Sequence, residues 1–292
     1  MTKIKTGSIQ AGENEIRFLE CGEGKPFLFA HGFPDHPGSF EHQMVYFGSR
    51  GYRVIAPYMR GYGPKLSEEN PTFGAYDTGS DLLKLMDALE ISKAILLGHD
   101  WGASAAYAAS FLAPERIEAL ITASVPYGTP FMQSLIADGD QQRRSWYMFF
   151  FLAPFAEAAV SANNFAFVER LWKEWSPGLT VPTAHMKTLK DIFSDPGNLT
   201  AALSYYRDTF SGKVRAGRND PAFKDFGRAG IKVPTLYLHG KQDGCISPSL
   251  ATDMEDYFEN GLVTEIIDQA GHFLQLEQPD LVNRTIEDFL NK

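Results

Sequence analysis

Apolar residues recur with two different spacings along this chain, and these spacings predict strands and helices that take turns. Short continuous apolar runs, such as residues 93–98 (KAILLG), predict buried strands, and stretches with apolar residues three or four positions apart, such as residues 78–89, predict amphipathic helices. The alternation runs from Asn14 to Val125 and returns near the carboxyl end of the chain. It is typical of a mostly parallel sheet covered by helices. The other predicted strands are residues 16–20, 26–30, 52–57, 117–125, 235–239 and 263–267, and the other predicted helices are residues 39–50, 103–112 and 279–290.

The segment from about residue 127 to residue 228 follows another pattern. It predicts helices only, is rich in Phe, Trp and Tyr, and is interrupted by Pro154, Pro177, Pro182 and Pro196. A helical insertion in an α/β core predicts a lid over the carboxyl ends of the strands, where open α/β sheets bind ligands. We therefore predict a core made of residues 1–127 and 229–292 and a lid, or cap domain, at residues 128–228.

The composition excludes several classes of protein. With 44% hydrophobic and 22% charged residues, the 292-residue chain is similar to ordinary globular proteins. Cys21 and Cys245 have no CxxC or Cys/His ligand spacing, which indicates a reducing compartment and argues against a zinc site. The chain lacks an apolar leader and an apolar run of membrane-spanning length, so we expect a cytoplasmic protein without a membrane partner. A net charge of −9, with scattered Lys and Arg, argues against nucleic acid as a partner.

The most specific local signal is the sequence Gly98-His99-Asp100-Trp101-Gly102, between a predicted buried strand and a helix of small residues. Glycines on either side of the central residue allow a strained strand-to-helix turn that raises one side chain into a cleft. The raised residue is Asp100, which makes it a candidate nucleophile. Taken alone, the same Asp would more often be a simple helix N-cap.

Three further pieces stand in the order that such a nucleophile requires. The turn His31-Gly32-Phe33-Pro34 follows an early strand, where the backbone N–H groups of Phe33 and Trp101 would form an oxyanion hole. Asp243 follows a predicted strand, and His272 is the only histidine late enough to follow both acids. Each piece alone fits an ordinary turn or helix start. Together they have the chain order nucleophile, acid, histidine and predict a catalytic triad.

These motifs resemble those of the α/β-hydrolase superfamily and, within it, the soluble epoxide hydrolases. The resemblance covers nearly the whole chain, from HGFPD (31–35) through APYMRGYG (56–63) and GHDWGA (98–103) to QDG (242–244) and GHF (271–273). It implies an α/β-hydrolase fold, with a mostly parallel eight-stranded sheet flanked by helices and an inserted helical lid. It also implies that the protein is an enzyme, namely an epoxide hydrolase, which belongs to the hydrolases that act on ether bonds.

An aspartate at this turn changes the chemistry relative to a serine. A carboxylate is already anionic at neutral pH, so Asp100 needs no base before it attacks a saturated carbon and forms an alkyl ester. His272, oriented by Asp243, is then available to activate the water that hydrolyses this ester, while the two amides hold the oxyanion. The resemblance to the epoxide hydrolases implies that the substrate is an apolar epoxide and that the product is a vicinal diol.

The leaving oxygen of an epoxide needs an acid on the far side of the reacting carbon. In the resembling family two lid tyrosines supply it, and the motifs place them at Tyr147, in WYMFFF, and at Tyr206, in LSYYR. Tyr205 is the rival of Tyr206, because neighbouring side chains on a helix point about 100° apart and only one can face the cleft. For each tyrosine the alternative is a ring that packs within an aromatic lid.

The same residues indicate the substrate and the partners. The aromatic lid indicates an apolar substrate, with Phe33, Trp101 and Phe151 as predicted substrate-binding residues. Water and side chains suffice for each step, so we expect neither a metal nor an organic cofactor. We expect a small apolar epoxide and water as the ligands. The sequence fits both a monomer and a homodimer.

Two other functions stay open. Haloalkane and haloacid dehalogenases use the same Asp-His-Asp triad, but halide release usually needs Asn where this chain has Phe33, or arginines after the nucleophile, which residues 101–106 (WGASAA) lack. A non-catalytic ligand-binding protein with the α/β-hydrolase fold would have no need of nucleophile, acid and histidine together.

The match with the family departs in one place. After HGFPD the chain reads His36-Pro37-Gly38, where the family usually carries an aromatic-rich stretch, so we expect a differently shaped cleft wall near Asp35. The remaining histidines are predicted to be structural. We expect the ring of His99 to point back into the sheet, His239 to close a strand, and the others, His36, His42 and His185, to lie at surface or helix positions.

Overall fold

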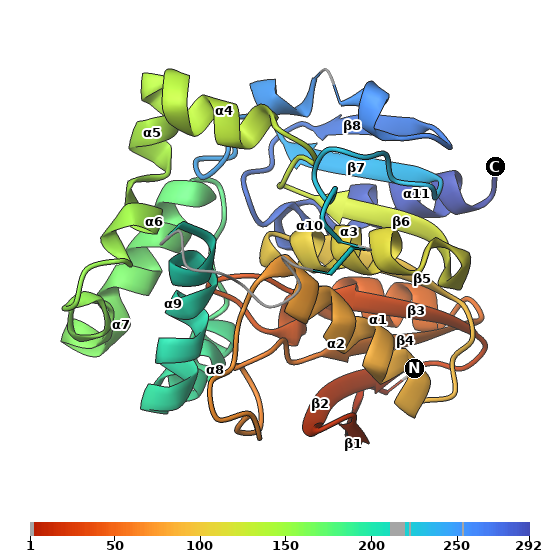
Figure 1. Cartoon of the computed structure of the whole chain (residues 1–292), viewed down its shortest axis with the longest axis horizontal. Coiled ribbons are helices and arrows are strands. Elements are labelled where there is room, and N and C mark those ends of the chain that lie inside the picture. Colours follow the sequence, from red (N-terminus) through yellow and green to blue (C-terminus); the bar gives the residue numbers. More distant parts are fainter. Residues whose placement is uncertain (1–2, 211–219, 222, 253) are drawn as a thin grey trace.

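A mixed sheet organises the molecule. The computed structural model describes residues 3–210, 220–221, 223–252 and 254–292, which contain an eight-stranded sheet in the order β1-β2-β4-β3-β5-β6-β7-β8 (Figure 1). β1 and β2 pair antiparallel, as do β2 and β4, and the other neighbours are parallel. The predicted mostly parallel eight-stranded sheet is therefore confirmed. The strands are β1 (Lys5–Ala11), β2 (Asn14–Cys21), β3 (Lys25–Ala30), β4 (Tyr52–Pro57), β5 (Ala94–His99), β6 (Ile117–Ala123), β7 (Thr235–Gly240) and β8 (Leu262–Ile267).

The strands are buried to different degrees, and their sequences explain why. Every residue of β5 and of β7 is buried, as continuous apolar runs in a parallel sheet require when helices cover both faces. β1 lies at the sheet edge, and most of its residues are exposed. It joins β2 through a two-residue turn at Gly12, whose φ is +63°. A search for apolar runs misses β1 because the strand is polar.

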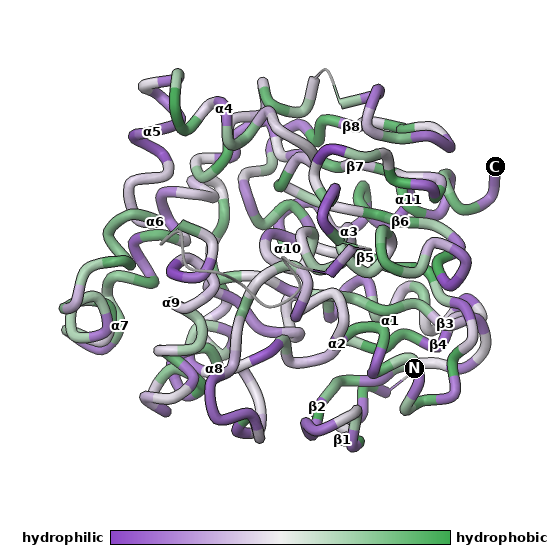
Figure 2. The backbone as a smooth tube through the Cα atoms, viewed as in Figure 1, coloured by the Kyte–Doolittle hydropathy of each residue, from purple (hydrophilic) through white to green (hydrophobic). Residues whose placement is uncertain are grey.

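Helices cover both faces of the sheet. α2 (Ala75–Ala88) and α3 (Trp101–Leu112) share one hydrophobic cluster with the strands, and α1 (Glu41–Gly48) and α11 (Pro279–Leu290) share the other. Figure 2 shows hydrophobic residues gathered along the strands and on the helices that meet them. None of the helices in the described ranges has the length and hydrophobicity that a bilayer crossing needs. The shorter helical elements of the core are α10 (Leu274–Glu277) and the 3-10 turns Pro37–Phe40, Pro114–Arg116, Pro248–Ala251 and Glu255–Tyr257.

The chain between β6 and β7 is helical in its described residues. Helices α4 to α9 follow one another there and lie together at one end of the sheet, on the left of Figure 1. α7 bends at residues 162–165, where Asn163, Asn164 and Phe165 have positive φ. Of the predicted lid at residues 128–228, residues 211–219 and 222 lie outside the described residues. The helices are α4 (Pro130–Ala137), α5 (Gly139–Arg144), α6 (Trp146–Phe150), α7 (Ala156–Trp175), α8 (Thr183–Phe193) and α9 (Pro196–Phe210).

Candidate active site

Asp100 lies at a strained turn between β5 and α3. Its φ is +55° and its ψ is −122°, a backbone conformation that few non-glycine residues adopt. The turn depends on two flanking glycines. A Cβ on Gly98 would lie 2.3 Å from the carbonyl oxygen of Gly102, and a Cβ on Gly102 would lie 1.9 Å from that of Ala30. The chain therefore forms the sharp strand-to-helix turn that the sequence predicts, with Asp100 at its tip.

The two carboxylate oxygens of Asp100 face different partners. Oδ1 accepts a hydrogen bond of 2.7 Å from the backbone N–H of Phe33, one of the two amides predicted for the oxyanion hole. The other amide belongs to Trp101, the first residue of α3, and therefore has no partner within the helix. Oδ2 lies 3.5 Å from Nε2 of His272. One oxygen is thus held by an amide, and the other faces the histidine.

His272 and Asp243 form a buried hydrogen-bonded pair. Nδ1 of His272 donates to Oδ2 of Asp243 at 2.9 Å, and Oδ1 of Asp243 accepts the amides of Cys245 and Ile246 at 2.7 and 3.0 Å. Burial lowers the pKa of His272, but the carboxylates of Asp243 and Asp100 outweigh it and raise this pKa to about 10. Burial raises the pKa of Asp243, and the neighbouring histidines more than reverse this, so that it lies far below its usual range. Both members of the pair are therefore charged at neutral pH.

Two side chains that the sequence analysis did not assign to the site hold the backbone of His272. Its carbonyl oxygen accepts hydrogen bonds of 2.8 Å from Nε2 of His99 and from Oγ of Ser124. Burial lowers the pKa of His99 to about 4, so this ring is neutral and donates through Nε2–H. His99 directly precedes Asp100 in the sequence, and this position could have indicated that His99 belongs to the site. Ser124 follows β6 without any motif that marks it.

His239 supports the acid of the predicted triad. Its Nε2 lies 3.2 Å from Oδ2 of Asp243, and its Nδ1 lies 2.6 Å from the hydroxyl oxygen of Tyr237. His239 is near the end of β7, as the sequence predicts, but its ring also contacts the catalytic candidate Asp243. A histidine four residues before the acid, at the end of the same strand, is the signal that points to it.

Tyr206 faces the nucleophile and Tyr205 does not. Tyr206 lines the same cavity as Asp100, and its buried hydroxyl makes no hydrogen bond of normal geometry to a described residue. Burial raises the pKa of Tyr206 well above 10, so the hydroxyl keeps its proton across the neutral range. The hydroxyl of Tyr205 instead donates to the carbonyl oxygen of Arg60 at 2.8 Å.

Tyr147 lies close to Tyr206, but a thiol contacts its hydroxyl. The two tyrosine ring centroids are 5.6 Å apart, and the hydroxyl oxygen of Tyr147 is 3.2 Å from Sγ of Cys245. Burial raises the pKa of both Tyr147 and Cys245 well above their ordinary values, so both keep their protons. Gln141 of α5 fixes this arrangement, because it donates to the carbonyl oxygen of Cys245 at 3.0 Å and accepts from the amide of Ser247 at 2.9 Å.

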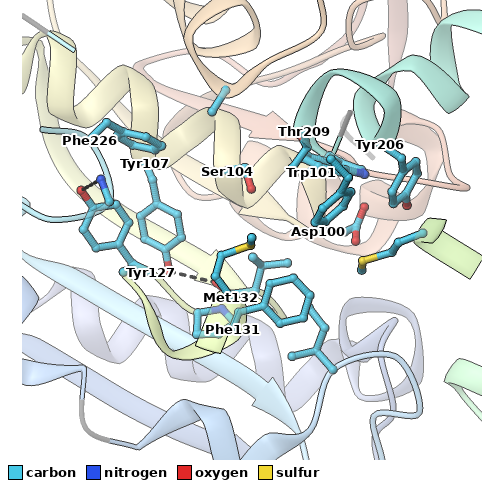
Figure 3. A pocket seen from close by; sticks show the side chains of 18 residues that line it. Asp100, Trp101, Ser104, Tyr107, Tyr127, Phe131, Met132, Tyr206, Thr209 and Phe226 are labelled. Carbon is cyan, nitrogen blue, oxygen red and sulfur yellow. Dashed lines mark hydrogen bonds between the residues drawn. The ribbon is translucent and has the colours of Figure 1, made fainter. Parts of the chain in front are cut away.

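A cavity of about 410 Å³ lies beside Asp100. In Figure 3, Asp100 and Tyr206 are at one end of it, and Tyr127 and Phe226 are at the other. The walls are mostly apolar, which fits the apolar substrate that the sequence predicts. Besides the residues labelled in Figure 3, the lining residues are Ala75, Val125, Pro126, Gly128, Met148, Phe210, Gly227 and Ile246.

The three predicted substrate-binding residues differ in their position relative to this cavity. Trp101 lines it next to Asp100. Phe33 and Phe151 do not line it; they pack against Tyr206, with ring centroids 5.3 and 5.0 Å from that of Tyr206. Phe33 therefore offers its backbone amide to Asp100, while its side-chain ring packs against Tyr206 and supports this part of the cavity wall.

The segment after HGFPD contains a buried histidine, which corrects the prediction of a surface or helix position for His36. His36 is only 5% exposed, and its ring stacks on that of His185 in α8, with centroids 4.0 Å apart. Nε2 of His185 lies 2.8 Å from Oδ1 of Asp35. Burial raises the pKa of Asp35, but the hydrogen bond and charge of His185 outweigh this and lower it to about 2. The departure from the family pattern thus forms a polar contact between the core and α8.

One group of side chains among the described residues has metal-ligand spacing. Ligand atoms of Asp243, Cys245 and His272 lie within 4.8 Å of one another. The group does not fit a metal, because Nδ1 of His272 carries the proton that it donates to Asp243 and the thiol of Cys245 keeps its own proton. A bound metal would have to break the hydrogen bond that orients His272.

Comparisons with known proteins agree with this fold. The family model of the alpha/beta hydrolase fold matches residues 25–279. Human epoxide hydrolase 4 is 31% identical over 288 residues, which cover 95% of this chain and 76% of the human protein. The crystal structure of a putative epoxide hydrolase from Klebsiella pneumoniae has a TM-score of 0.89 and 25% identity, covering 99% of this chain and 98% of that one. Bacillus megaterium epoxide hydrolase, at 24% identity, shares the fold with a TM-score of 0.84, covering 98% of this chain and all of its own.

The chain belongs to the α/β-hydrolase family. The predicted likeness to the epoxide hydrolases within that family is confirmed, since relatives that cover nearly the whole chain carry that name.

Proposed function

We propose that this protein hydrolyses epoxides to vicinal diols through a covalent ester on Asp100. The observation that carries the proposal is the surroundings of this carboxylate. Asp100 lies at the tip of the strand-to-helix turn, 3.5 Å from a histidine that is paired with a second buried carboxylate. It shares a cavity with Tyr206, whose hydroxyl makes no hydrogen bond of normal geometry to the residues that the structure describes. Several relatives whose match extends over nearly all of this chain are named epoxide hydrolases, which supports the same substrate class.

Asp100 attacks the epoxide through Oδ2. Because Oδ1 accepts the Phe33 amide, Oδ2 is the oxygen left free to form a bond with a ring carbon. The bond from that carbon to the epoxide oxygen breaks, and its electron pair leaves with the oxygen. Tyr206 donates its proton to this alkoxide, and Tyr147, 5.6 Å away between ring centroids, assists as the second acid.

The ester changes the charge around His272. While Asp100 is an anion, two carboxylates raise the pKa of His272 to about 10. Ester formation neutralises Asp100, so only Asp243 is left to raise this pKa. The imidazole then loses its proton more readily, and this proton restores the hydroxyl of Tyr206. The neutral ring then takes a proton from water, which attacks the ester carbonyl carbon. The amides of Phe33 and Trp101 stabilise the oxyanion. The bond from the carbonyl carbon to Oδ2 then breaks, the departing oxygen takes the proton from His272, and the diol leaves with the oxygen that Asp100 supplied. The new carboxyl group of Asp100 returns its proton to His272.

The helices between β6 and β7 act as a cap in this proposal. Residues 128–228 contribute Tyr147 and Tyr206, so the acids come from the insertion and the nucleophile comes from the core. The loop with Asp243 is tied to the cap by Gln141 and by Arg144, which donates to the carbonyl oxygen of Asp243 at 2.6 Å. These bonds fix the distance between the two halves of the site.

Paired substrates test the function. Purified protein is given 1,2-epoxyoctane and 1-bromooctane, and diol and bromide are measured. We expect diol without bromide, and no diol from Asp100→Ala, since Phe33 carries no side-chain donor for a departing halide. Bromide release at a comparable rate would favour a dehalogenase, and binding of the epoxide without any product would favour a ligand-binding protein.

A further inference from the structure

The polar side chains that line the active-site cavity differ in how far the protein satisfies them. The hydroxyl of Tyr107 pairs with Oγ1 of Thr122 at 2.7 Å and donates to the carbonyl oxygen of Val125 at 3.1 Å. The hydroxyl of Tyr127 donates to the carbonyl oxygen of Ala229 at 3.0 Å. Neither hydroxyl therefore needs a partner from a ligand.

The hydroxyl of Ser104 differs from these two in its hydrogen bonding. It lines the cavity from α3, between Asp100 and Tyr107, and its hydroxyl makes no hydrogen bond to any residue of the described ranges (Figure 3). Serines on helices usually bond the carbonyl four residues earlier. Three lid serines do so at 2.8 Å: Ser161, Ser194 and Ser204. For Ser104 that carbonyl belongs to Asp100 and already accepts the backbone amides of Ala103 and Ser104.

The position of Ser104 relates it directly to the nucleophile. Four residues of α-helix advance about 6 Å, so Ser104 lies one turn beyond Asp100 along the same wall. The cavity runs from Asp100 past Ser104 toward Tyr127 and Phe226, so a substrate whose epoxide carbon contacts Asp100 would extend its chain in that direction. The hydroxyl therefore meets the part of the substrate that lies a few bonds from the epoxide ring.

We propose that Ser104 is a specificity-determining residue that donates a hydrogen bond to an ether or hydroxyl oxygen on the substrate chain. The preferred substrates are then epoxides that carry such an oxygen a few bonds from the ring, with an apolar tail beyond it. The physical reason is that a purely hydrocarbon chain would cover the hydroxyl and leave it unpaired, whereas an oxygen in the chain satisfies it. The apolar walls at Phe131, Met132 and Phe210 accommodate the tail. This inference rests on the proposed epoxide hydrolysis.

Isosteric substrates test it. In butyl glycidyl ether an oxygen replaces the fourth carbon of 1,2-epoxyoctane, and two further isomers move that oxygen to the fifth and sixth positions. The kcat/KM of each ether is divided by that of 1,2-epoxyoctane, in the parent and in Ser104→Ala. We expect at least one ether to lose about fivefold in this ratio on substitution, as loss of one neutral hydrogen bond predicts. The intrinsic reactivity of each ether and of 1,2-epoxyoctane is the same for the parent and for Ser104→Ala, so it cancels when the ratios of the two proteins are compared.

Ser110→Ala is the matched control. Ser110 is on the same helix, is buried without a hydrogen-bond partner among the described residues, and does not line the cavity, so its substitution should leave every ratio unchanged. Ratios that are the same in the parent and in Ser104→Ala, for all three ethers, would overturn the inference while hydrolysis continues. Absence of hydrolysis of all four compounds by the parent would instead contradict the proposed function.

Discussion

Nε2 of His272 lies 3.5 Å from Oδ2 of Asp100, so the proposed base and the proposed nucleophile act directly on each other's charge. The interaction helps to raise the pKa of His272 to about 10 in the free enzyme, where Asp100 is an anion. In the ester this interaction disappears. His272 is therefore protonated at neutral pH before ring opening, and it can lose this proton and act as the base in ester hydrolysis.

The pH dependence of ester hydrolysis follows from this relationship. The step needs neutral His272, so its rate should rise with pH, and its midpoint should lie below about 10 because Asp100 no longer carries a charge. Single-turnover tryptophan fluorescence across pH 6 to 10 measures it. A rate that still rises at pH 10 without approaching a plateau would place the midpoint at or above pH 10 and would show that the charge of Asp100 does not act on His272.

Substitution of the base should separate the two steps. His272→Gln should still open the epoxide, and the ester should then persist, with its hydrolysis slowed by about 10²- to 10⁴-fold. Mass spectrometry of the intact protein after mixing with substrate would show the adduct. Rapid disappearance of the adduct would contradict the role of His272.

The two lid tyrosines should contribute unequally to the rate of ring opening. Among the described residues the hydroxyl of Tyr206 makes no hydrogen bond of normal geometry, whereas that of Tyr147 is 3.2 Å from the thiol of Cys245. We expect Tyr206→Phe to slow ring opening by about 100-fold or more, which is within the range of general acid catalysis, and Tyr147→Phe to slow it by less, about tenfold. The double variant should not form the ester. Equal losses in the two single variants would contradict the assignment of Tyr206 as the main acid.

The strand-to-helix turn should tolerate no side chain at Gly102. A Cβ there would lie 1.9 Å from the carbonyl oxygen of Ala30, so Gly102→Ala should lower the free energy of unfolding by about 3 kcal/mol and displace Asp100. Urea unfolding and the rate of diol formation report the two effects. Gly139→Ala is the control, because a Cβ on Gly139 would meet nothing within 4 Å, and it should change stability by less than about 0.5 kcal/mol. Equal stability of the two variants would contradict this account of the turn.

The features that the sequence predicts are those that local physics determines. Buried parallel strands such as β5 and β7 are continuous apolar runs, so their position can be predicted to within a residue or two. The glycines around Asp100 mark a turn that few other residues permit. The order of Asp100, Asp243 and His272 could be compared with a known arrangement, and the structure brings the three side chains together.

Other features depend on contacts between segments that are distant in the chain. The carbonyl of His272 is held by Ser124, and the stack of His36 on His185 joins a core loop to α8. β1 is too polar to be recognised as a strand before its pairing with β2 is known. Phe151, a predicted substrate-binding residue, does not line the cavity and instead packs its ring against that of Tyr206. Such pairings have no periodicity within one segment, so the pattern of residues could not reveal them.

A single turnover in ¹⁸O-labelled water, with protein in excess over epoxide, tests the covalent step most directly. The account predicts that the diol from this first turnover contains no label, because its new oxygen comes from Oδ2 of Asp100, and that one ¹⁸O appears in the peptide that contains Asp100. Label in the first-turnover diol, with an unlabelled Asp100 peptide, would mean that water attacks the epoxide directly and would contradict the mechanism.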